Sequence, residues 1–510
     1  MTHRVGVCLA PTGAAAVAML CAFGALISAQ VGGAPQSSGA EPGARVPYDL
    51  LMTREQVDAV RRAWNERLPY VPGEVLMKFR PGVEVAGRVR ALAAVRAGVE
   101  EGNAHWIGDT LWVRASGEPD AELLAAALER QPEIEWAQPN RLYWTKATPN
   151  DPLYNRQWNF DLIDMPRAWD INTGASETIT IAIADTGVTT TSTTFQFPLW
   201  TGSQIDAVSV PFQLSPEINA ARIDPGRDFV FWTGPVLDMV GHGTHVASTA
   251  LQETNNNLAL AGIAYRARVM PLKTCFGYWE IQIVQSARGI PGYVDPRDEG
   301  GCPNSAIAQA IRYAADNGAH VLNISFGGPG ASPATLDALR YAVGRGLFVA
   351  MAAGNEFDTG NPTEYPAAYA PELGGAMAVG AVGRGSRRAF YSSTGSHLEI
   401  AAPGGDFRDG GLSGVIYQTS LDEDDSDPFT IIRPRFDRYT EVPAQGTSMA
   451  APHIAGVAAL LRSQGIATPE AIEAAIKRFA RDLGTTGRDD EFGHGLVDAR
   501  TTLRGLGAVK

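Results

Sequence analysis

The sequence predicts two folded units, a small α+β domain followed by a larger α/β domain built on a parallel sheet. One reason is length, because 510 residues exceed a typical single domain. Another is a series of near-continuous apolar, β-prone runs separated by helical stretches: Thr178–Asp185, His320–Phe326 and Leu347–Ala353. Buried strands that alternate with helices indicate a parallel sheet covered by helices. Before about Thr148 the helical stretches are shorter and the order of elements differs.

The first 29 residues are typical of an export signal. His3 and Arg4 precede an apolar run from Ala14 to Ile27, and Ala29 supplies a small residue at the cleavage point. The run is short for a membrane span, which needs about 20 apolar residues. We therefore expect a secreted or periplasmic protein with no stable membrane association. An uncleaved anchor is the alternative, and residues 30–70 are expected to form a leader and linker.

The small domain is expected over residues 71–147. Its strand-like and helical segments, in chain order, are Gly73–Phe79 (strand), Arg88–Gly98 (helix), Ala104–Ile107 and Asp109–Ala115 (strands), Asp120–Gln131 (helix) and Glu133–Ala137 (strand). This order matches a split βαβ unit, which is a ferredoxin-like arrangement. The domain is too small to hold an obvious active site of its own.

The larger domain is expected over residues 148–510. Helical segments Ser305–Gly318 and Ala334–Gly346 lie between its predicted strands, and Pro469 after Thr468 opens a further helix at a favoured position. In open parallel sheets, functional residues collect at the carboxyl ends of the strands. The loops that follow the predicted strands are therefore where we look for chemistry.

Composition excludes some functions and suggests one covalent link. A net charge of −13 disfavours a nucleic-acid-binding protein, which would carry a basic patch. Of the four cysteines, Cys8 and Cys21 would leave with the export signal. Two cysteines in an exported domain favour one disulfide, between Cys275 and Cys302, with two unpaired thiols as the alternative.

Three residues far apart in the chain suggest nucleophilic catalysis. Asp185 ends a buried apolar strand, where a carboxylate needs a hydrogen-bonding partner. His242 is flanked by glycines just before a helical stretch, and Ser448 precedes another. A serine becomes an effective nucleophile when an adjacent base takes its proton, and histidine can accept and return a proton near neutrality. An aspartate would hold the imidazole in the required tautomer.

Pro452, four residues after Ser448, is unfavourable in the interior of the predicted helix. In a helix interior, proline lacks the N–H that would bond to the carbonyl four residues back, here the carbonyl of Ser448. Departures of this kind often occur at functional sites.

These residues stand in motifs that resemble the subtilisin-like serine proteases (subtilases, peptidase S8). The motifs DTGV, GHGTHVAS, NISFGG, AAGN and GTSMAAPH occur in the order and at the approximate spacing of that family, over about Asp151–Asp498. The order aspartate, histidine, serine is also that of the subtilisin triad. The resemblance implies a subtilisin-like fold, a secreted serine endopeptidase that acts through an acyl-enzyme, and a triad of Asp185, His242 and Ser448.

The resemblance also implies roles for other residues. Asn355 would donate to the oxyanion together with the backbone N–H of Ser448. Ser325, Phe326, Gly327 and Gly328 would pair with an extended substrate backbone. Ala353 and Gly354 would form the facing wall of the pocket for the side chain before the cut bond.

Glu364 would lie in the wall of the same specificity pocket. A carboxylate there would favour lysine or arginine in substrates. The alternative is an exposed loop glutamate with no part in binding, so the sequence leaves basic and apolar preferences both open.

No cofactor is expected for catalysis, and a structural calcium is left open without assigned ligands. Thr254–Gly262 resembles the family's calcium loop, but the irregular region Thr189–Asp238 lacks the aspartate that usually serves as a ligand. The stretch Phe231–Val240 also replaces a commonly acidic approach to the histidine. His242 and His245 could be zinc ligands, but no credible third ligand accompanies them. His245 and His453 are therefore expected to be packed helix residues.

By the same resemblance, residues 71–147 would be an inhibitory propeptide, with Glu135–Asn140 as its closing strand and cleavage near Trp144–Thr148. The expected partners are peptide substrates and the protein's own propeptide, and the enzyme is expected to be a monomer. Rival interpretations are a permanent accessory domain, a non-catalytic relative that binds peptides, and an export-associated chaperone with an inert second domain.

Overall fold

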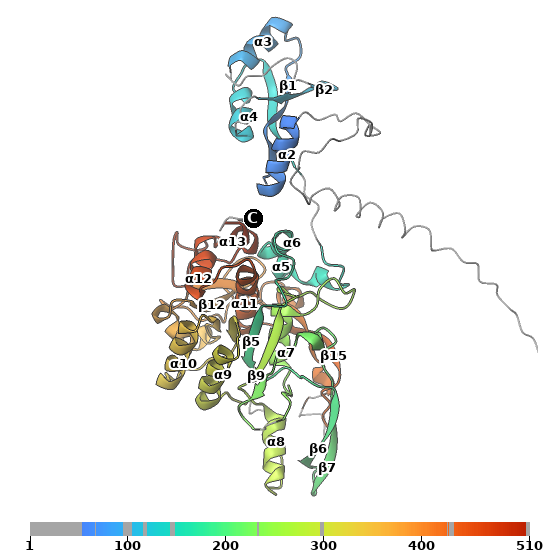
Figure 1. The fold of residues 1–510 in the computed structure, drawn as a ribbon, viewed down its shortest axis with the longest axis vertical. Coiled ribbons are helices and arrows are strands. Elements are labelled where there is room, and N and C mark those ends of the chain that lie inside the picture. The colour runs from blue at the N-terminus through green and yellow to red at the C-terminus, as the bar shows by residue number, and fades with distance from the viewer. Residues whose placement is uncertain are drawn as a thin grey trace, which may run out of the picture. The chain divides into compact units, whose positions relative to one another are not determined.

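The computed structural model describes residues 54–66, 68–94, 105–115, 120–142, 148–231, 234–295, 300–425, 427 and 433–505. The predicted export signal and most of the leader lie outside these residues. The chain divides into two compact units, Met1–Trp144 and Thr145–Lys510, each treated by itself below (Figure 1). None of the helices described has both the length and the apolar character needed to cross a membrane.

The first unit is a four-stranded antiparallel sheet with helices. Its elements are α2 (Arg54–Glu66), β1 (Tyr70–Phe79), α3 (Val85–Ala94), β2 (His105–Ile107), β3 (Thr110–Arg114), α4 (Ala121–Glu129) and β4 (Ile134–Arg141). The strand order β2-β3-β1-β4 is that of a split βαβ unit, so the predicted ferredoxin-like arrangement is confirmed. Asp120 caps α4 by accepting from the N–H groups of Glu122 and Leu123. Helix α2, in the stretch expected to be leader, was not predicted.

The second unit is built on a seven-stranded parallel sheet, as the sequence predicted. Its strands are β5 (Thr180–Asp185), β8 (Arg227–Asp228), β9 (Arg268–Lys273), β10 (Val321–Ile324), β11 (Phe348–Ala352), β12 (Ala376–Val382) and β13 (Ile400–Pro403), in the order β13-β12-β11-β10-β5-β9-β8. Every residue of β5, β10 and β11 is buried. Burial on both faces explains why these segments are continuous apolar runs with no alternation.

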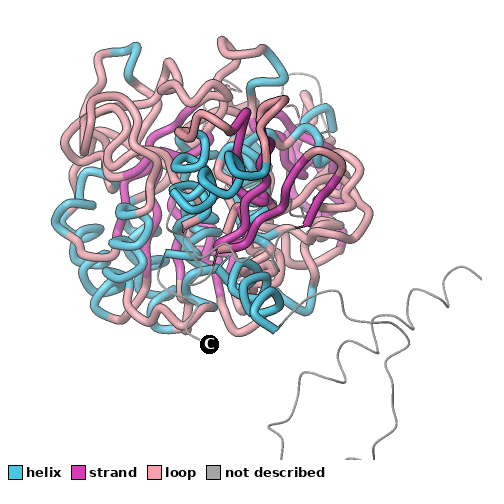
Figure 2. The backbone as a smooth tube through the Cα atoms, turned by 90° about the horizontal axis from the view of Figure 1, so that it is seen from above, coloured by secondary structure: helices cyan, strands magenta, loops and turns pink. Residues whose placement is uncertain are grey.

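Helices cover both faces of this sheet, and Figure 2 shows the strands running inside them. The helices of the unit are α5 (Trp158–Leu162), α6 (Met165–Trp169), α7 (His242–Leu251), α8 (Tyr278–Ala287), α9 (Asn304–Asp316), α10 (Pro333–Gly344), α11 (Thr447–Ser463), α12 (Pro469–Arg478) and α13 (Ala499–Gly505). Alternate residues of β5 point to opposite faces. Ile181 and Ile183 pack with residues of α7 and α11, whereas Ala182 and Ala184 pack with residues of α9 and α10.

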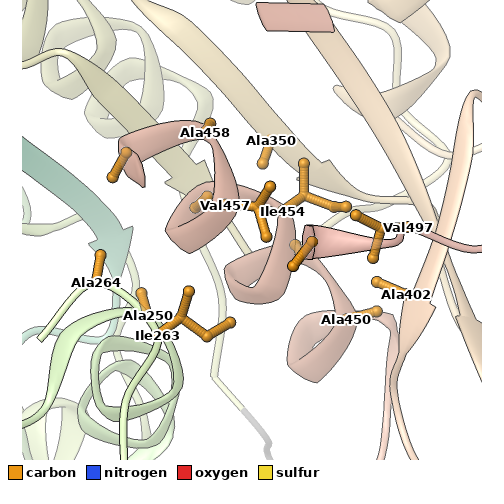
Figure 3. Close-up of a cluster of buried hydrophobic side chains, with 14 of the residues drawn as sticks. Ala250, Ile263, Ala264, Ala350, Ala402, Ala450, Ile454, Val457, Ala458 and Val497 are labelled. Carbon is orange, nitrogen blue, oxygen red and sulfur yellow. The ribbon is translucent and has the colours of Figure 1, made fainter. Parts of the chain in front are cut away.

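Helix α11 is the most deeply buried element beside the sheet. Figure 3 shows Ala450, Ile454 and Val457 of this helix among side chains from distant segments. A side chain at Gly456 would place its Cβ 2.7 Å from Ile263, so the helix approaches its neighbour too closely for any larger residue. This packing fixes the position of the start of the helix.

Two antiparallel hairpins complete the unit. They are β6–β7 (Thr193–Trp200 and Ile205–Phe212) and β14–β15 (Ile416–Leu421 and Tyr439–Ala444). The first lies in the region expected to be irregular and was not predicted. It packs against α8 through a separate apolar cluster that includes Leu199, Val208 and Trp279, and Figure 1 shows the hairpin and the helix side by side.

The predicted disulfide joins Cys275, just after β9, to Cys302, just before α9. The cysteines are 27 positions apart. In the chain-entropy model, opening a loop of this length costs about 3–4 kcal/mol. We predict that dithiothreitol will lower the free energy of unfolding of the second unit by about that amount, measured by urea unfolding.

The control for this prediction is the double variant Cys275→Ala/Cys302→Ala. It should already have the lower stability, and dithiothreitol should not change it further. An unchanged unfolding curve of the oxidised wild type after reduction would contradict the prediction.

Candidate active site

The predicted catalytic and substrate-binding residues lie at the carboxyl edge of the parallel sheet. Asp185 ends β5, Ser325 follows β10, and Asn355 follows β11, while His242 and Ser448 stand in the first turns of α7 and α11. A cavity of about 520 Å³ is lined by Asp185, His242, Ser448 and the segment Ser325–Gly328. Residues separated by more than 200 positions therefore face one space, as the strand-end rule predicted.

Asp185 and His242 form a hydrogen bond of 2.7 Å between the carboxylate Oδ1 and the imidazole Nδ1. The aspartate is 1% exposed and also accepts from the N–H of Thr186 at 2.7 Å, whereas the histidine is 33% exposed and borders the cavity. Burial lowers the pKa of His242, but the charge of Asp185 and its hydrogen bond outweigh burial and leave this pKa above its usual value. With Nδ1–H donated to Asp185, the other ring nitrogen, Nε2, is the one left to act as a base.

Asp238 positions these two residues and was missed by the sequence analysis. Its fully buried carboxylate accepts from the N–H groups of Val240, Gly241 and Thr244, which caps the start of α7. It also accepts from the hydroxyl of Thr186, next to Asp185. The stretch Phe231–Val240, expected to replace a commonly acidic approach to the histidine, still supplies one buried carboxylate there. The signal that could have identified Asp238 is its place just before a helix, where acidic caps are preferred.

Ser448 is joined to Ser325 by two reciprocal hydrogen bonds. The hydroxyl of Ser325 donates to the carbonyl of Ser448 at 2.9 Å, and the hydroxyl of Ser448 donates to the carbonyl of Ser325 at 2.8 Å. Since Pro452 has no N–H, the Ser448 carbonyl has no helical donor and is free for this contact. The side-chain NH₂ of Asn323 donates a hydrogen bond of 2.8 Å to the Ser325 hydroxyl. The Ser448 hydroxyl thus borders the cavity and donates its hydrogen bond to the backbone carbonyl of Ser325, not to His242.

Two N–H donors lie near the start of α11, the side-chain NH₂ of Asn355, from the loop after β11, and the backbone N–H of Ser448. The amide oxygen of Asn355 accepts from the backbone N–H and the hydroxyl of Thr447, at 2.9 and 3.0 Å. These bonds fix the amide orientation and leave its NH₂ group without a partner among the described residues. Among the residues that the structure describes, the backbone N–H of Ser448 also has no hydrogen-bond acceptor. Unpaired donors at a helix start form a site for negative charge.

The predicted substrate-binding segment is open on the cavity side. Gly328 pairs with Tyr365 through backbone hydrogen bonds of 3.0 and 2.8 Å, which holds the loop that carries Glu364 against the segment. Ala353 is fully buried and Gly354 follows it. Glu364 is only 5% exposed, so the alternative in which it is an exposed loop residue is wrong.

A second polar cluster lies away from the cavity. Glu217 is fully buried and its Oε1 has no hydrogen-bond partner in the described structure, while its Oε2 accepts from Asn256 at 3.3 Å. Asp151 accepts from the N–H groups of Asn255 and Asn256. Burial is the main cause that raises the pKa of Glu217 to about 7. The sequence analysis expected this region to lack the aspartate that usually serves as a calcium ligand, and it did not identify Glu217.

Other histidines are engaged in packing. His245 contacts the carbonyl of Val442 through Nε2 at 3.1 Å, and His453 contacts the carbonyl of Met449 and the side chain of Asn159 at 2.8 and 2.9 Å. Among the described residues there is no group of three or more histidine, cysteine, aspartate or glutamate side chains that could hold a metal.

Comparisons with known proteins agree with this geometry. A model of the subtilase family, peptidase S8, matches residues 176–495. The thermophilic serine proteinase of Bacillus sp. (strain AK1) is 31% identical over 431 residues, which are 84% of this chain and 87% of that protein. Thermitase of Thermoactinomyces vulgaris is 31% identical over 341 residues, 67% of this chain and 94% of thermitase.

A solved structure of a protease from Pseudoalteromonas arctica PAMC 21717 is also similar. It is 28% identical, has a TM-score of 0.51, and covers 70% of this chain and 99% of its own. The family model matches this chain, and two relatives are 31% identical to it over two thirds or more of its length. With the parallel sheet, these findings show that the chain belongs to the subtilase family and is a serine endopeptidase.

Proposed function

We propose that the protein is a secreted, self-processing endopeptidase in which Asp185, His242 and Ser448 are the triad and Asn355 contributes to the oxyanion hole. The observation that carries this proposal is the 2.7 Å bond between His242 and Asp185 in the cavity that Ser448 also lines. The expectation of secretion has support from relatives described as extracellular, such as the extracellular protease of Xanthomonas campestris.

In the first half of the reaction, the Ser448 hydroxyl leaves the Ser325 carbonyl and attacks the carbonyl carbon of the scissile bond. Its proton passes to Nε2 of His242, and Asp185 stabilises the resulting imidazolium. The carbonyl electron pair moves to the oxygen, where the N–H of Ser448 and the NH₂ of Asn355 can donate. Collapse breaks the C–N bond, the departing amine takes the proton from His242, and an acyl-serine remains.

In the second half, water takes the place of the amine. His242 removes a proton from the water as its oxygen attacks the acyl carbon, and the same two donors meet the second oxyanion. The bond to Ser448 then breaks and the serine oxygen regains its proton from His242. The new carboxylic acid leaves, and no metal or cofactor takes part in either half.

The substrate would bind as an extended strand along Ser325, Phe326, Gly327 and Gly328, by backbone hydrogen bonds. The side chain before the cut bond would enter between this segment and Ala353–Gly354. Glu364, buried between the two, would favour lysine or arginine there. The cleft walls rest on strands β10 and β11, which hydrogen-bond to each other in register.

We further propose that residues 71–147 are an inhibitory propeptide that the enzyme removes by cleavage near Trp144–Thr148. Support comes from the ferredoxin-like unit and from its separation from the second unit at Trp144–Thr145. A monomeric enzyme with protein or peptide substrates, and with its own propeptide as an intramolecular inhibitor, remains our expectation.

A structural calcium would suit Asp151, Glu217 and Asn256. Calcium takes several oxygen ligands from carboxylates, amides and backbone carbonyls, so two carboxylates suffice when other oxygens are near. The buried, unpartnered Oε1 of Glu217 and the adjacent carboxylate of Asp151 leave negative charge that a cation would neutralise. The ion would stabilise the fold at this place, away from the catalytic cavity.

Replacement of Ser448 by alanine tests the nucleophile and the processing together. Wild type should lose everything before roughly Thr148 on export, whereas Ser448→Ala should keep its prodomain, as measured by intact mass. Ser413→Ala, at an exposed hydroxyl on another loop, is the control and should mature normally. If wild type and Ser448→Ala both lost the prodomain, self-processing would be wrong, and activity on a peptide would decide the rest.

The raised pKa of His242 predicts the acidic limb of the pH profile. The base must be neutral, so kcat/KM for a substrate without titratable groups should fall as pH decreases through an apparent pKa above 6.5. Asp185→Asn removes the charge that favours the imidazolium. The limb should then move to lower pH, while kcat falls by about 10⁴. An acidic limb that stays in place in Asp185→Asn would exclude this pairing as its cause.

Removal of calcium tests the proposed cation site without any turnover. In the Ser448→Ala form, which cannot digest itself, EDTA should lower Tm by about 5 °C or more and added calcium should restore it. Glu217→Gln should abolish this response, whereas Glu372→Gln, an exposed carboxylate elsewhere, should keep it. A Tm that is insensitive to EDTA and calcium in the parent form would refute the site.

A further inference from the structure

Lys273, the last residue of β9, carries its ammonium group inside the protein. It is the register partner of Asp185 on the neighbouring strand β5, and its side chain is 0% exposed. A buried charge needs a partner, because it has lost its hydration. The partner is Glu280 in the first turn of α8, also 0% exposed, whose Oε1 lies 2.7 Å from Nζ of the lysine. The proposed mechanism uses neither residue of this buried ion pair.

The same ammonium group donates to the backbone carbonyl of Thr186, the residue after Asp185. The chain turns sharply there, since Gly187 has a φ of 116°, in the left-handed region. A buried carbonyl in such a turn needs a donor, and Lys273 supplies one. The same strand end also holds the aspartate itself, because the N–H of Thr274 donates to the Asp185 carbonyl at 2.8 Å.

Thr186 connects this turn to both members of the proposed acid–base pair. Its N–H donates to Oδ1 of Asp185 at 2.7 Å, the oxygen that His242 also contacts. Its hydroxyl accepts from the N–H of Gly243, next to His242, at 2.9 Å and donates to Asp238 at 3.0 Å. Every polar group of Thr186 is therefore engaged, and a shift of its carbonyl would disturb contacts to both catalytic side chains.

Glu280 holds the ammonium group from the other side. Its Oε2 accepts from the N–H of Gly277 at 3.0 Å, which anchors the start of α8. Cys275 and Cys302, on either side of α8 in the chain, form the disulfide, and both line the catalytic cavity. The ends of β5 and β9 and the start of α8 thus meet at one buried ion pair.

Stability alone does not account for such a pair. Taking two charges out of water costs about as much as their attraction returns, so apolar residues of similar size are often equally stable in their place. What an ion pair adds is direction, because the ammonium N–H bonds must point at their acceptors.

We propose that the ion pair of Lys273 and Glu280 is a positioning device for catalysis. It holds the turn at Thr186, and this turn keeps the Asp185 carboxylate in line with His242. The proposal rests on the proposed proteolytic function and adds two positioning residues to it. Neither side chain lines the cavity, so their loss should lower kcat and leave KM unchanged.

The test replaces the pair by apolar side chains of similar size, in the double variant Lys273→Met/Glu280→Leu. Because both charges leave together, its Tm should stay near that of wild type, whereas Lys273→Met alone leaves a buried carboxylate unpaired and should lower Tm. The Thr186 carbonyl loses its donor in both variants. With a peptide p-nitroanilide and the mature enzyme, kcat of the double variant should fall about 10- to 100-fold, and KM should stay within about twofold.

Glu280→Gln is a milder variant, for use if the double variant does not fold. The amide oxygen still accepts from the ammonium group of Lys273, but without a charge. Its kcat should therefore lie between those of wild type and Lys273→Met, with KM again unchanged. A wild-type kcat in Glu280→Gln, measured in this way, would overturn the proposal.

The matched control is a lysine in another part of the same unit. Lys477 of α12 is 20% exposed and pairs with Glu473 and Glu399, and none of the three lines the cavity. Lys477→Met should lower Tm without changing kcat or KM. If kcat fell as much in this control as in the double variant, the effect would be a general loss of stability, and the proposal would be wrong.

A measurement without turnover reports on the catalytic pair directly. In the Ser448→Ala form, the proton between His242 and Asp185 should give a far-downfield NMR resonance, because it lies in a charge-assisted hydrogen bond. The double substitution at the ion pair should shift this resonance upfield or broaden it beyond detection. The control substitution should leave it in place, and the rest of the spectrum shows whether each fold is intact.

The outcomes separate this inference from the proposed function. A folded double variant with wild-type kcat, or with an unchanged resonance, would overturn the positioning role while proteolysis stands. A wild type that cleaves no peptide would overturn the proposed function, and the resonance would still show whether the ion pair holds the histidine.

Discussion

The pair of hydrogen bonds between Ser325 and Ser448 is the contact on which the site depends. Pro452 removes one helical donor, and the carbonyl that it leaves free binds the residue that begins the substrate-binding segment. The helix with the proposed nucleophile, Ser448, and the edge that would hold the substrate are thereby fixed to each other. On the other side, Asp238 joins the start of α7 to the turn after Asp185. Each proposed catalytic group is held by a buried polar contact at the end of an element.

These contacts are possible because the elements behind them cannot shift. Helix α11 lies against the sheet through small residues, and Gly456 allows it to reach Ile263 (Figure 3). Close-packed interiors resist displacement, so the ends of the helices and strands are held in place. Polar groups at those ends can then be matched to one another. In this protein the apolar core sets the precision of the polar site.

The sequence was most informative where burial dominates. The apolar runs at β5, β10 and β11 have no solvent face, and the strand-end rule then pointed to Asp185, whereas Asn355 was inferred from the family resemblance. It was least informative where a single proline, or a contact with a residue distant in sequence, determines the local structure. Pro198 and Pro211 lie inside β6 and β7, where proline weakens the sequence signal for a strand, and this region was expected to be irregular. Glu217 becomes meaningful only through the neighbours that the fold brings to it.

The order of the elements along the chain has a consequence for synthesis. Asp185 and His242 are 57 positions apart and lie in the early part of the second unit, whereas Ser448 begins its last long helix. A growing chain can place the proposed base and its carboxylate together, but it lacks the proposed nucleophile until α11 has been made and has packed. The activity therefore arises as one of the last events of folding, when nearly all of the molecule that it could damage is already compact.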